Sequence, residues 1–281
     1  MVYPFKIPKR PNNNLVLQID KTNKFYNKLH QHEEIQLSYI ISGEGTLILG
    51  NSVTNFTSGD LIGIGSNIPH LFKSSDSSFT STSHMISLFF SKDAFGKDFF
   101  NSPEMDYVKP IFNSLPQGLK IKDSDGSLHN HFSSFKNSNK FELLIGLLEL
   151  LRYLVKNEKQ YLSEKKYYSK ISDYQGQRLQ VVIDFVLNNF SDPIALDDVA
   201  KKIPMGKNSF CRFFKQRTNK TFFEFLAEIR IQHACNLLGE NIDMPINEIA
   251  LKSGYQTISN FNRQFKKIKG TYPKSYRELL F

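Results

Sequence analysis

The chain has 281 residues, more than the roughly 100 to 200 that one domain usually holds, so two domains are expected. Hydrophobic residues make up 40% of it and exclude disorder throughout, while its two cysteines, neither in a CxxC pair, exclude a disulfide framework or a zinc knuckle. The formal net charge is +9, and from Tyr174 onward 16 Lys and Arg against 10 Asp and Glu leave +6, a surplus that favours a polyanionic partner for that part.

The sequence carries no sign of export or of a membrane span. Its first ten residues, MVYPFKIPKR, contain no apolar run, and the longest apolar segment, near 141–155, is interrupted by Glu142, Glu149 and Arg152. We therefore expect a cytoplasmic protein without a membrane partner.

Residues 15–90 have a strand-like pattern, in which short apolar runs alternate with residues that are typical of hairpin turns. The apolar runs are 37–41, 46–49 and 61–64, and the turns are Gly43-Glu44-Gly45, Gly50-Asn51 and Gly59-Asp60. This spacing predicts an antiparallel barrel or sandwich, and we place a first domain at residues 1–120.

A connector is expected over residues 121–173, because most of 123–139 is polar and lacks hydrophobic periodicity. The pattern then becomes helical and predicts an amphipathic helix over about 141–156. Its apolar residues recur at spacings of three and four: Phe141, Leu144, Leu148, Leu151 and Val155. This stripe has two interpretations, because it can pack against the chain's own barrel or form the seam of a homodimer.

The C-terminal region, 174–281, contains a weak internal repeat. At an offset of 50 residues, Leu196, Asp198, Val199 and Ala200 align with Ile246, Glu248, Ile249 and Ala250. At an offset of 51, Phe210, Arg212, Phe214 and Lys215 align with Phe261, Arg263, Phe265 and Lys266. Each copy has a short helix, a turn with Gly or Pro, and a second helix with aromatic residues at i and i+4, the plan of a helix-turn-helix. We expect two such units, at about 196–217 and 246–268, in an all-α domain.

The second helix of each unit is suited to DNA. Its aromatic pair lies on one face and anchors the helix in the core, so the opposite face must look outward. That face carries side chains that can pair with base edges or hold phosphate: Lys207, Asn208, Cys211, Arg212 and Lys215 in the first unit, and Ser259, Asn260, Asn262, Arg263, Lys266 and Lys267 in the second. Duplication of the whole pattern makes two ordinary basic helices the weaker interpretation.

Over about 177–276 the sequence resembles the AraC/XylS family of bacterial transcriptional regulators. The motifs that carry the resemblance are LDDVAKK, SFCRFFKQRTNKTFFEFLAEIRIQHACNLL, INEIALKSGY and SNFNRQFKKIKGTYPKSYR. The resemblance implies two three-helix subdomains joined by a long helix at about 222–238, with both recognition helices in successive major grooves of double-stranded promoter DNA. It also implies RNA polymerase as a partner, with activation as the commoner outcome.

The same motifs imply roles for particular residues. By position, the base-reading residues are Asn208, Cys211 and Arg212 in the first unit, and Ser259, Asn260, Asn262 and Arg263 in the second. The chain departs from the family at Gly206, where many members have Ser as the N-cap of the first recognition helix, and at Asn219, where they have Gly after it. Both are tolerable, because Gly can occupy an N-cap and Asn can adopt the left-handed C-cap conformation.

The first domain resembles the cupin barrels that often precede this DNA-binding domain. His30-Gln31-His32, then Gln36 and Gly43, matches the first cupin motif, and Gly59-Asp60 through Pro69-His70 matches the second. Alternate residues of a strand point to one side, so His30 and His32 are expected to face the barrel interior with His70. Gln36 stands where the usual Glu would be, and a neutral amide is a poor ligand for a divalent transition metal. We expect an effector pocket of His30, His32, Gln36 and His70, with no metal or other cofactor.

Together these patterns predict an α+β protein with an N-terminal cupin-like antiparallel barrel, a helical connector and a C-terminal all-α domain of tandem helix-turn-helix units. The favoured function is sequence-specific regulation of transcription, as an activator controlled by a small molecule in the barrel, without catalytic residues. An alternative is a metal-dependent cupin enzyme that carries a DNA-binding tail. A third interpretation is a scaffold that binds DNA without an effector.

Overall fold

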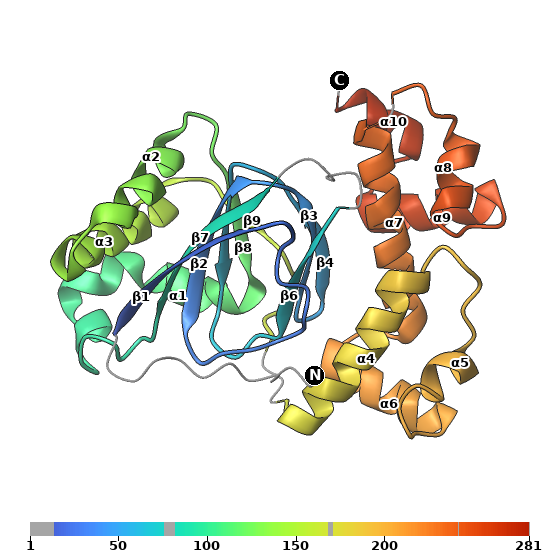
Figure 1. Cartoon of the computed structure of the whole chain (residues 1–281), viewed down its shortest axis with the longest axis horizontal. Coiled ribbons are helices and arrows are strands. Elements are labelled where there is room, and N and C mark those ends of the chain that lie inside the picture. Colours follow the sequence, from blue (N-terminus) through green and yellow to red (C-terminus); the bar gives the residue numbers. More distant parts are fainter. Residues whose placement is uncertain (1–13, 76–81, 168–170, 241, 281) are drawn as a thin grey trace. The chain divides into compact units, whose positions relative to one another are not determined.

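The computed structural model describes residues 14–75, 82–167, 171–240 and 242–280. The chain divides into two compact units, Met1–Gly176 and Gln177–Phe281 (Figure 1). The first is an antiparallel β-fold with attached helices and the second is helical, which confirms the expected α+β class. The first 13 residues of the expected sensing domain, and residues 168–170 of the expected connector, lie outside the described residues.

Two sheets form the framework of the first unit. Among the described residues their nine strands are β1 (Leu15–Thr22), β2 (Ile35–Ser42), β3 (Gly45–Leu49), β4 (Ser52–Phe56), β5 (Asp60–Ile64), β6 (His70–Ser74), β7 (Ser83–Phe90), β8 (Leu119–Lys122) and β9 (Gln160–Tyr161). The larger sheet has the order β1-β7-β2-β5-β8-β9, the smaller has β4-β3-β6, and the paired strands are antiparallel. The runs expected at 37–41, 46–49 and 61–64 fall within β2, β3 and β5.

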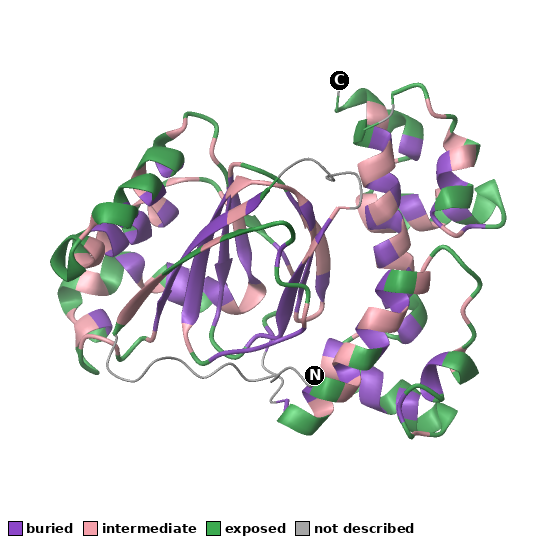
Figure 2. Ribbon diagram, in the orientation of Figure 1, coloured by how far each residue is buried: buried purple, intermediate pink, exposed green. Residues whose placement is uncertain are grey.

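Strand β2 shows how the larger sheet separates two environments, because successive side chains of a strand point to opposite faces. Leu37 and Tyr39 belong to a hydrophobic cluster shared with the helices, whereas Gln36 and Ser38 are buried on the other face. The helices of this cluster are α1 (Lys109–Ser114), α2 (Ser127–Ser134) and α3 (Lys140–Lys156), with the 3-10 helices η1 (Phe99–Asn101), η2 (Pro103–Val108), η3 (Leu115–Gln117) and η4 (Phe135–Asn137). Figure 2 shows this buried layer between helices and strands.

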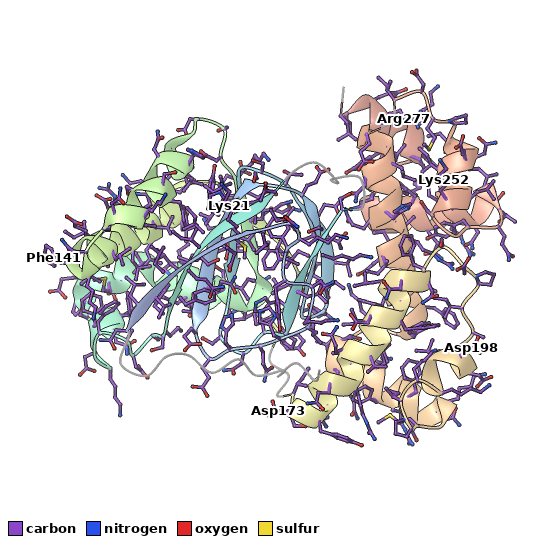
Figure 3. The ribbon with its side chains drawn as sticks, in the orientation of Figure 1. Lys21, Phe141, Asp173, Asp198, Lys252 and Arg277 are labelled. Atoms are coloured by element: carbon purple, nitrogen blue, oxygen red, sulfur yellow. The ribbon has the colours of Figure 1, made fainter. Side chains whose placement is uncertain are left out.

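Helix α3 begins at a capping box and buries one side in the first unit. The Asn139 carboxamide oxygen accepts from the backbone amides of Phe141 and Glu142 at 2.9 and 3.0 Å, and Glu142 Oε2 accepts from the Asn139 amide at 2.8 Å. Leu151 is 0% exposed in the shared cluster, whereas Phe141 is 70% exposed and points outward (Figure 3). The segment expected as a connector therefore adds a helix to this unit, and Leu151 packs against the chain's own sheet.

We predict that Leu151→Ala lowers the free energy of unfolding of the first unit by about 2 to 5 kcal/mol, because it opens a cavity in a closed core. Phe141→Ala is the matched control on the same helix and should change that free energy by less than about 0.5 kcal/mol. Urea unfolding followed by circular dichroism measures both. Equal losses in the two variants would mean that α3 packs through a different face.

The second unit is an array of helices. They are α4 (Asp173–Asn189), which begins just before the unit, α5 (Leu196–Ala200), α6 (Lys207–Thr218), α7 (Phe222–Glu240), α8 (Ile246–Lys252), α9 (Ile258–Lys269) and α10 (Pro273–Glu278). Helices α5 and α8 start 50 residues apart, and α6 and α9 start 51 apart, which matches the sequence repeat. The long helix expected at about 222–238 is α7. Within the described residues, no helix has the length and apolar character that a membrane span requires.

Aromatic pairs hold both repeated helices in their cores. Phe210 and Phe214 of α6 are fully buried with ring centroids 5.8 Å apart, and both rings lie 5.7 Å from that of Phe222 on α7. Phe261 and Phe265 of α9 are buried in the same way, with centroids 5.6 Å apart, in a cluster with residues of α7 and α8. Helix α7 therefore contributes to both cores.

Candidate nucleic-acid interface

Helix α6 starts and ends at the two positions where the chain departs from the family pattern. Gly206 is its N-cap in an extended conformation with φ −72° and ψ 155°, and Asn219 is its C-cap with φ 55° in the left-handed region. A glycine needs no side chain to enter a helix, and asparagine tolerates positive φ better than most residues. Both expected accommodations are confirmed.

The face of α6 opposite its aromatic pair is exposed. Asn208, Cys211, Arg212 and Lys215 all lie on it, as the sequence predicted. Lys207, at the start of the helix, is also exposed, and its Nζ lies 3.4 Å from Asp197 Oδ2 of α5. Its ammonium group thus interacts with a carboxylate at the edge of the exposed face.

Helix α9 presents the corresponding face of the second helix-turn-helix. The Thr257 hydroxyl caps its start by accepting from the backbone amide of Asn260 at 3.4 Å. Ser259, Asn260, Arg263, Lys266 and Lys267 are exposed. Two of the predicted base-reading residues also contact each other, since Arg263 Nη2 donates to Asn260 Oδ1 at 3.0 Å. This bond orients the guanidinium on the exposed surface.

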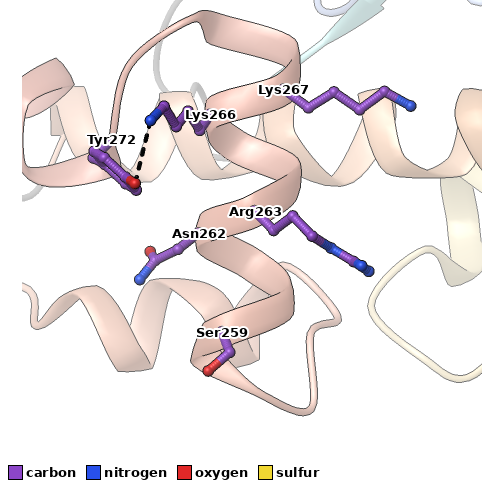
Figure 4. A pocket seen from close by; sticks show the side chains of 6 residues that line it. All are labelled: Ser259, Asn262, Arg263, Lys266, Lys267 and Tyr272. Carbon is purple, nitrogen blue, oxygen red and sulfur yellow. Dashed lines mark hydrogen bonds between the residues drawn. The ribbon is translucent and has the colours of Figure 1, made fainter.

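Asn262 differs from the other predicted residues of α9. It is only partly exposed, and its Oδ1 is buried without a hydrogen-bond partner. It lines an open hollow of about 490 Å³ on the helix surface, together with Ser259, Arg263, Lys266, Lys267 and Tyr272 (Figure 4). An orphaned acceptor at the edge of a basic hollow points to a polar ligand group.

Tyr272 is the residue of this hollow that the sequence analysis missed. The Lys266 ammonium lies 4.7 Å from its ring centroid and donates to its hydroxyl at 3.3 Å. Tyr272 is the N-cap of α10 and follows the left-handed Gly270 that ends α9. The signal available in the sequence was the Gly-Thr-Tyr-Pro run, which turns the chain back toward α9.

The first unit brings together the four residues predicted as an effector pocket. His30 and His32 lie in the segment before β2, not on one strand as expected, and His70 begins β6. An isolated β-bridge pairs His30 with His70, and all four residues are buried or nearly so. The three imidazoles place ligand nitrogens within 4.8 Å of one another.

The protonation of these rings follows from their surroundings. Each Nδ1 lies 2.8 to 2.9 Å from a backbone carbonyl oxygen, of Lys28, Glu34 and Ile68 respectively. A carbonyl only accepts, so each Nδ1 carries the proton and donates it. Burial lowers the pKa of the His30 imidazole to about 4 and that of His70 well below its ordinary value. The neutral rings of His30 and His70, with the proton on Nδ1, carry their lone pair on Nε2.

Gln36 closes the site from β2. Its Nε2 donates to Ser38 Oγ at 2.7 Å, and the Ser38 and Ser87 hydroxyls lie 2.6 Å apart. This series of hydrogen bonds places Gln36 Oε1 3.0 Å from His32 Nε2. At this distance His32 Nε2 and Gln36 Oε1 form a hydrogen bond, whereas the Nε2 of His70 is buried without a hydrogen-bond partner. The site therefore contains one imidazole nitrogen, His70 Nε2, that is free to bind a ligand.

Comparison with known proteins covers both units. Residues 199–279 match a family described as a helix-turn-helix domain, and residues 17–80 match a family described as a cupin domain. The transcriptional regulator YdeC of Bacillus subtilis is 20% identical over 269 residues, which cover 90% of this chain and 87% of YdeC. The transcriptional activator RhaR of Mannheimia succiniciproducens is 24% identical over 259 residues, or 89% of this chain and 86% of RhaR. The regulatory protein SoxS of Salmonella typhimurium is 30% identical over 104 residues, which cover 37% of this chain and 96% of SoxS.

The chain belongs to the AraC/XylS family of transcriptional regulators. As a member of this family it is a DNA-binding transcriptional regulator, and its helix-turn-helix domain lies in the second unit. The relatives that match the chain over most of its length are transcriptional regulators and not enzymes, so the alternative of a cupin enzyme with a DNA-binding tail finds no support.

We predict that Arg263→Ala weakens binding to the specific site by about 1 to 3 kcal/mol and relaxes base preference at one position, because a base contact is lost. Lys252→Ala, an exposed cation of α8 that pairs with Glu248, is the control and should leave specificity unchanged. Fluorescence anisotropy with single-base variants of the site measures both effects. A uniform loss on all sequences would show that Arg263 contacts phosphate.

Proposed function

We propose that this AraC/XylS member is a sequence-specific DNA-binding activator, located in the cytoplasm and controlled by a small-molecule effector in its barrel. The observation that carries the DNA-binding part is the repetition of one arrangement, a helix anchored by a buried aromatic pair. In both helix-turn-helix motifs, two buried Phe residues fix a helix whose opposite face exposes Arg, Asn and Lys side chains. Arg pairs with guanine, Asn with adenine and Lys with phosphate, so two such faces can read two blocks of one promoter.

The activator role rests on the relatives and on the expected partners. RhaR, which is similar to this chain over most of its length, is a transcriptional activator by name. An activator of this kind contacts RNA polymerase from a neighbouring promoter site.

The exposed Phe141 and Ile145 on α3 supply an apolar strip for a second copy of the chain, which makes a homodimer part of the proposal.

The effector site that we propose is centred on His30, His32, Gln36 and His70. Its support is the set of buried acceptors that lack partners, His70 Nε2 and Gln31 Oε1. Buried polar atoms are normally satisfied, so these two point to a ligand. Gln31 also offers a route for the signal, because its Nε2 donates to the Ile171 carbonyl at 3.2 Å, two residues before α4 begins. An effector that moves Gln31 acts on the segment that leads into the DNA-binding unit.

The same site fits a divalent transition-metal ion better than the sequence indicated. The Nε2 atoms of His30, His32 and His70 would hold it, with Gln36 Oε1 beside them, and the carbonyl-bound Nδ1 groups give each ring the orientation that metal-binding histidines need. The ion would supply positive charge and a coordination position for an effector. Because these donors are neutral, an anionic effector group suits the site best.

Selection from random duplex DNA tests the regulatory proposal. The full-length chain should recover a motif with two blocks about one helical turn apart, because α6 and α9 read successive major grooves. The Arg212→Ala, Arg263→Ala double variant should lose this motif and keep only salt-sensitive binding. No enriched motif with the unchanged chain, in the presence or absence of cell metabolites, would overturn sequence-specific regulation.

Zinc binding tests the barrel site. The purified chain should bind about one equivalent of Zn²⁺, and metal at about 100 times Kd should stabilise the first unit by about 2.7 kcal/mol. His70→Ala should abolish both effects, whereas His129→Ala, an exposed histidine of α2, should keep them. Elemental analysis and thermal unfolding provide the readouts. A chain that binds no metal and melts at an unchanged temperature would limit the site to metal-free effectors.

A further inference from the structure

One arginine of α7 connects the two helix-turn-helix units. Arg230 is half-buried, and its Nε donates to the Phe190 carbonyl at 2.7 Å while its Nη2 donates to the Asp192 carbonyl at 2.8 Å. Phe190 and Asp192 lie between α4 and α5, in the first helix-turn-helix subdomain. Two donors of one planar guanidinium therefore bind two carbonyls of the same loop, which fixes the position of that loop against α7.

The other side of Arg230 faces the second subdomain. Its Cζ lies 5.7 Å from the ring centroid of Tyr255, which is buried and packs edge-to-face on Phe261 of α9 at 5.3 Å. Tyr255 stands in the turn between α8 and the recognition helix α9. The guanidinium is thus in contact with the loop that precedes α5 and with the turn that precedes α9.

Gly254 shows how closely the two subdomains approach each other here. Its φ is +81°, and a Cβ placed on it would lie 2.5 Å from the Phe190 carbonyl oxygen and 2.8 Å from Arg230 Nε. Any side chain at this position would push the Phe190 loop away. A second contact runs beside it, since the His233 ring lies 4.8 Å from that of Phe190 and its Nδ1 lies 3.2 Å from Ser253 Oγ.

We propose that Arg230 is a positioning residue that fixes the angle and separation of α6 and α9, and so sets the spacing between the two DNA blocks. The effect on the spacing between DNA blocks rests on the proposed sequence-specific binding. The effect on the angle and separation of α6 and α9, which is the geometric part, does not. Helix α7 joins the subdomains along a single axis and leaves a bending and a twisting motion about it. The Arg230 contacts lie off that axis, between the Phe190 loop and the α8–α9 turn, where they oppose both motions.

The geometric part is tested without DNA. Spin labels on the exposed native Cys211 of α6 and on Lys267→Cys of α9, with the buried Cys235→Ser in every variant, report the distance between the recognition helices. Double electron–electron resonance should give one narrow distance distribution for the otherwise unchanged chain and a broad one for Arg230→Ala. An unchanged narrow distribution in Arg230→Ala overturns the proposal.

Arg277→Ala is the matched control for this experiment. Arg277 also donates from a guanidinium to a backbone carbonyl, that of Met244 at 2.6 Å, but both residues belong to the second subdomain. Its removal should leave the distribution narrow. Circular dichroism checks that each variant keeps its helices, and if Arg230→Ala does not fold, Arg230→Gln, which keeps one neutral donor, is measured by the same criterion.

The DNA part uses duplexes that carry both selected blocks, with the spacer changed by one or two base pairs. The unchanged chain should prefer one spacer, and Arg230→Ala should reduce that preference by about tenfold while it still recognises each block. A preference equal to that of the unchanged chain overturns the proposal. Loss of both blocks in the unchanged chain contradicts the proposed function instead, and the distance distributions then still test the role of Arg230.

Discussion

The DNA-binding unit depends on one constraint, the burial of two Phe side chains four residues apart in each recognition helix. Phe210 with Phe214, and Phe261 with Phe265, are fully buried, and each pair fixes the rotation of its helix about its own axis. Rotation of either helix by one residue would expose an aromatic ring and bury a cation, which costs several kcal/mol. The side chains that we propose to face DNA are therefore oriented by residues of the buried core.

In the first unit, the alternation of side chains along a strand separates a hydrophobic face from a polar one. The alternation of β2 sends Leu37 and Tyr39 toward the helices and Gln36 and Ser38 toward the histidines. One strand thereby supplies both a hydrophobic core and a polar interior, and the helical layer that includes α3 shields the core side. Because the imidazoles of His30 and His70 are desolvated, burial lowers their pKa values and they stay neutral near physiological pH, which leaves the Nε2 lone pair of His70 available to a ligand.

The sequence predicts what local periodicity controls and fails where side chains meet across the fold. The duplicated Phe spacing located helices α6 and α9 and their outward faces, and the caps at Gly206 and Asn219 followed from backbone preferences. The stripe on α3 did not reveal that Leu151 faces the sheet while Phe141 stays outside. Neither the partial burial of Asn262 nor the approach of Tyr272 to Lys266 has a local signature, because both depend on how α10 returns to α9.

The imidazole tethers have an evolutionary consequence. Each ring is oriented by a carbonyl only two residues away in its own segment, whereas Gln36 belongs to a different element and is held by serines. If residue 36 changes, the backbone carbonyls that hold the three rings therefore stay in place, and only the contact with His32 Nε2 is altered. Glutamine and glutamate codons differ by a single first base, so one point mutation would convert this neutral site into an anionic one on the same backbone.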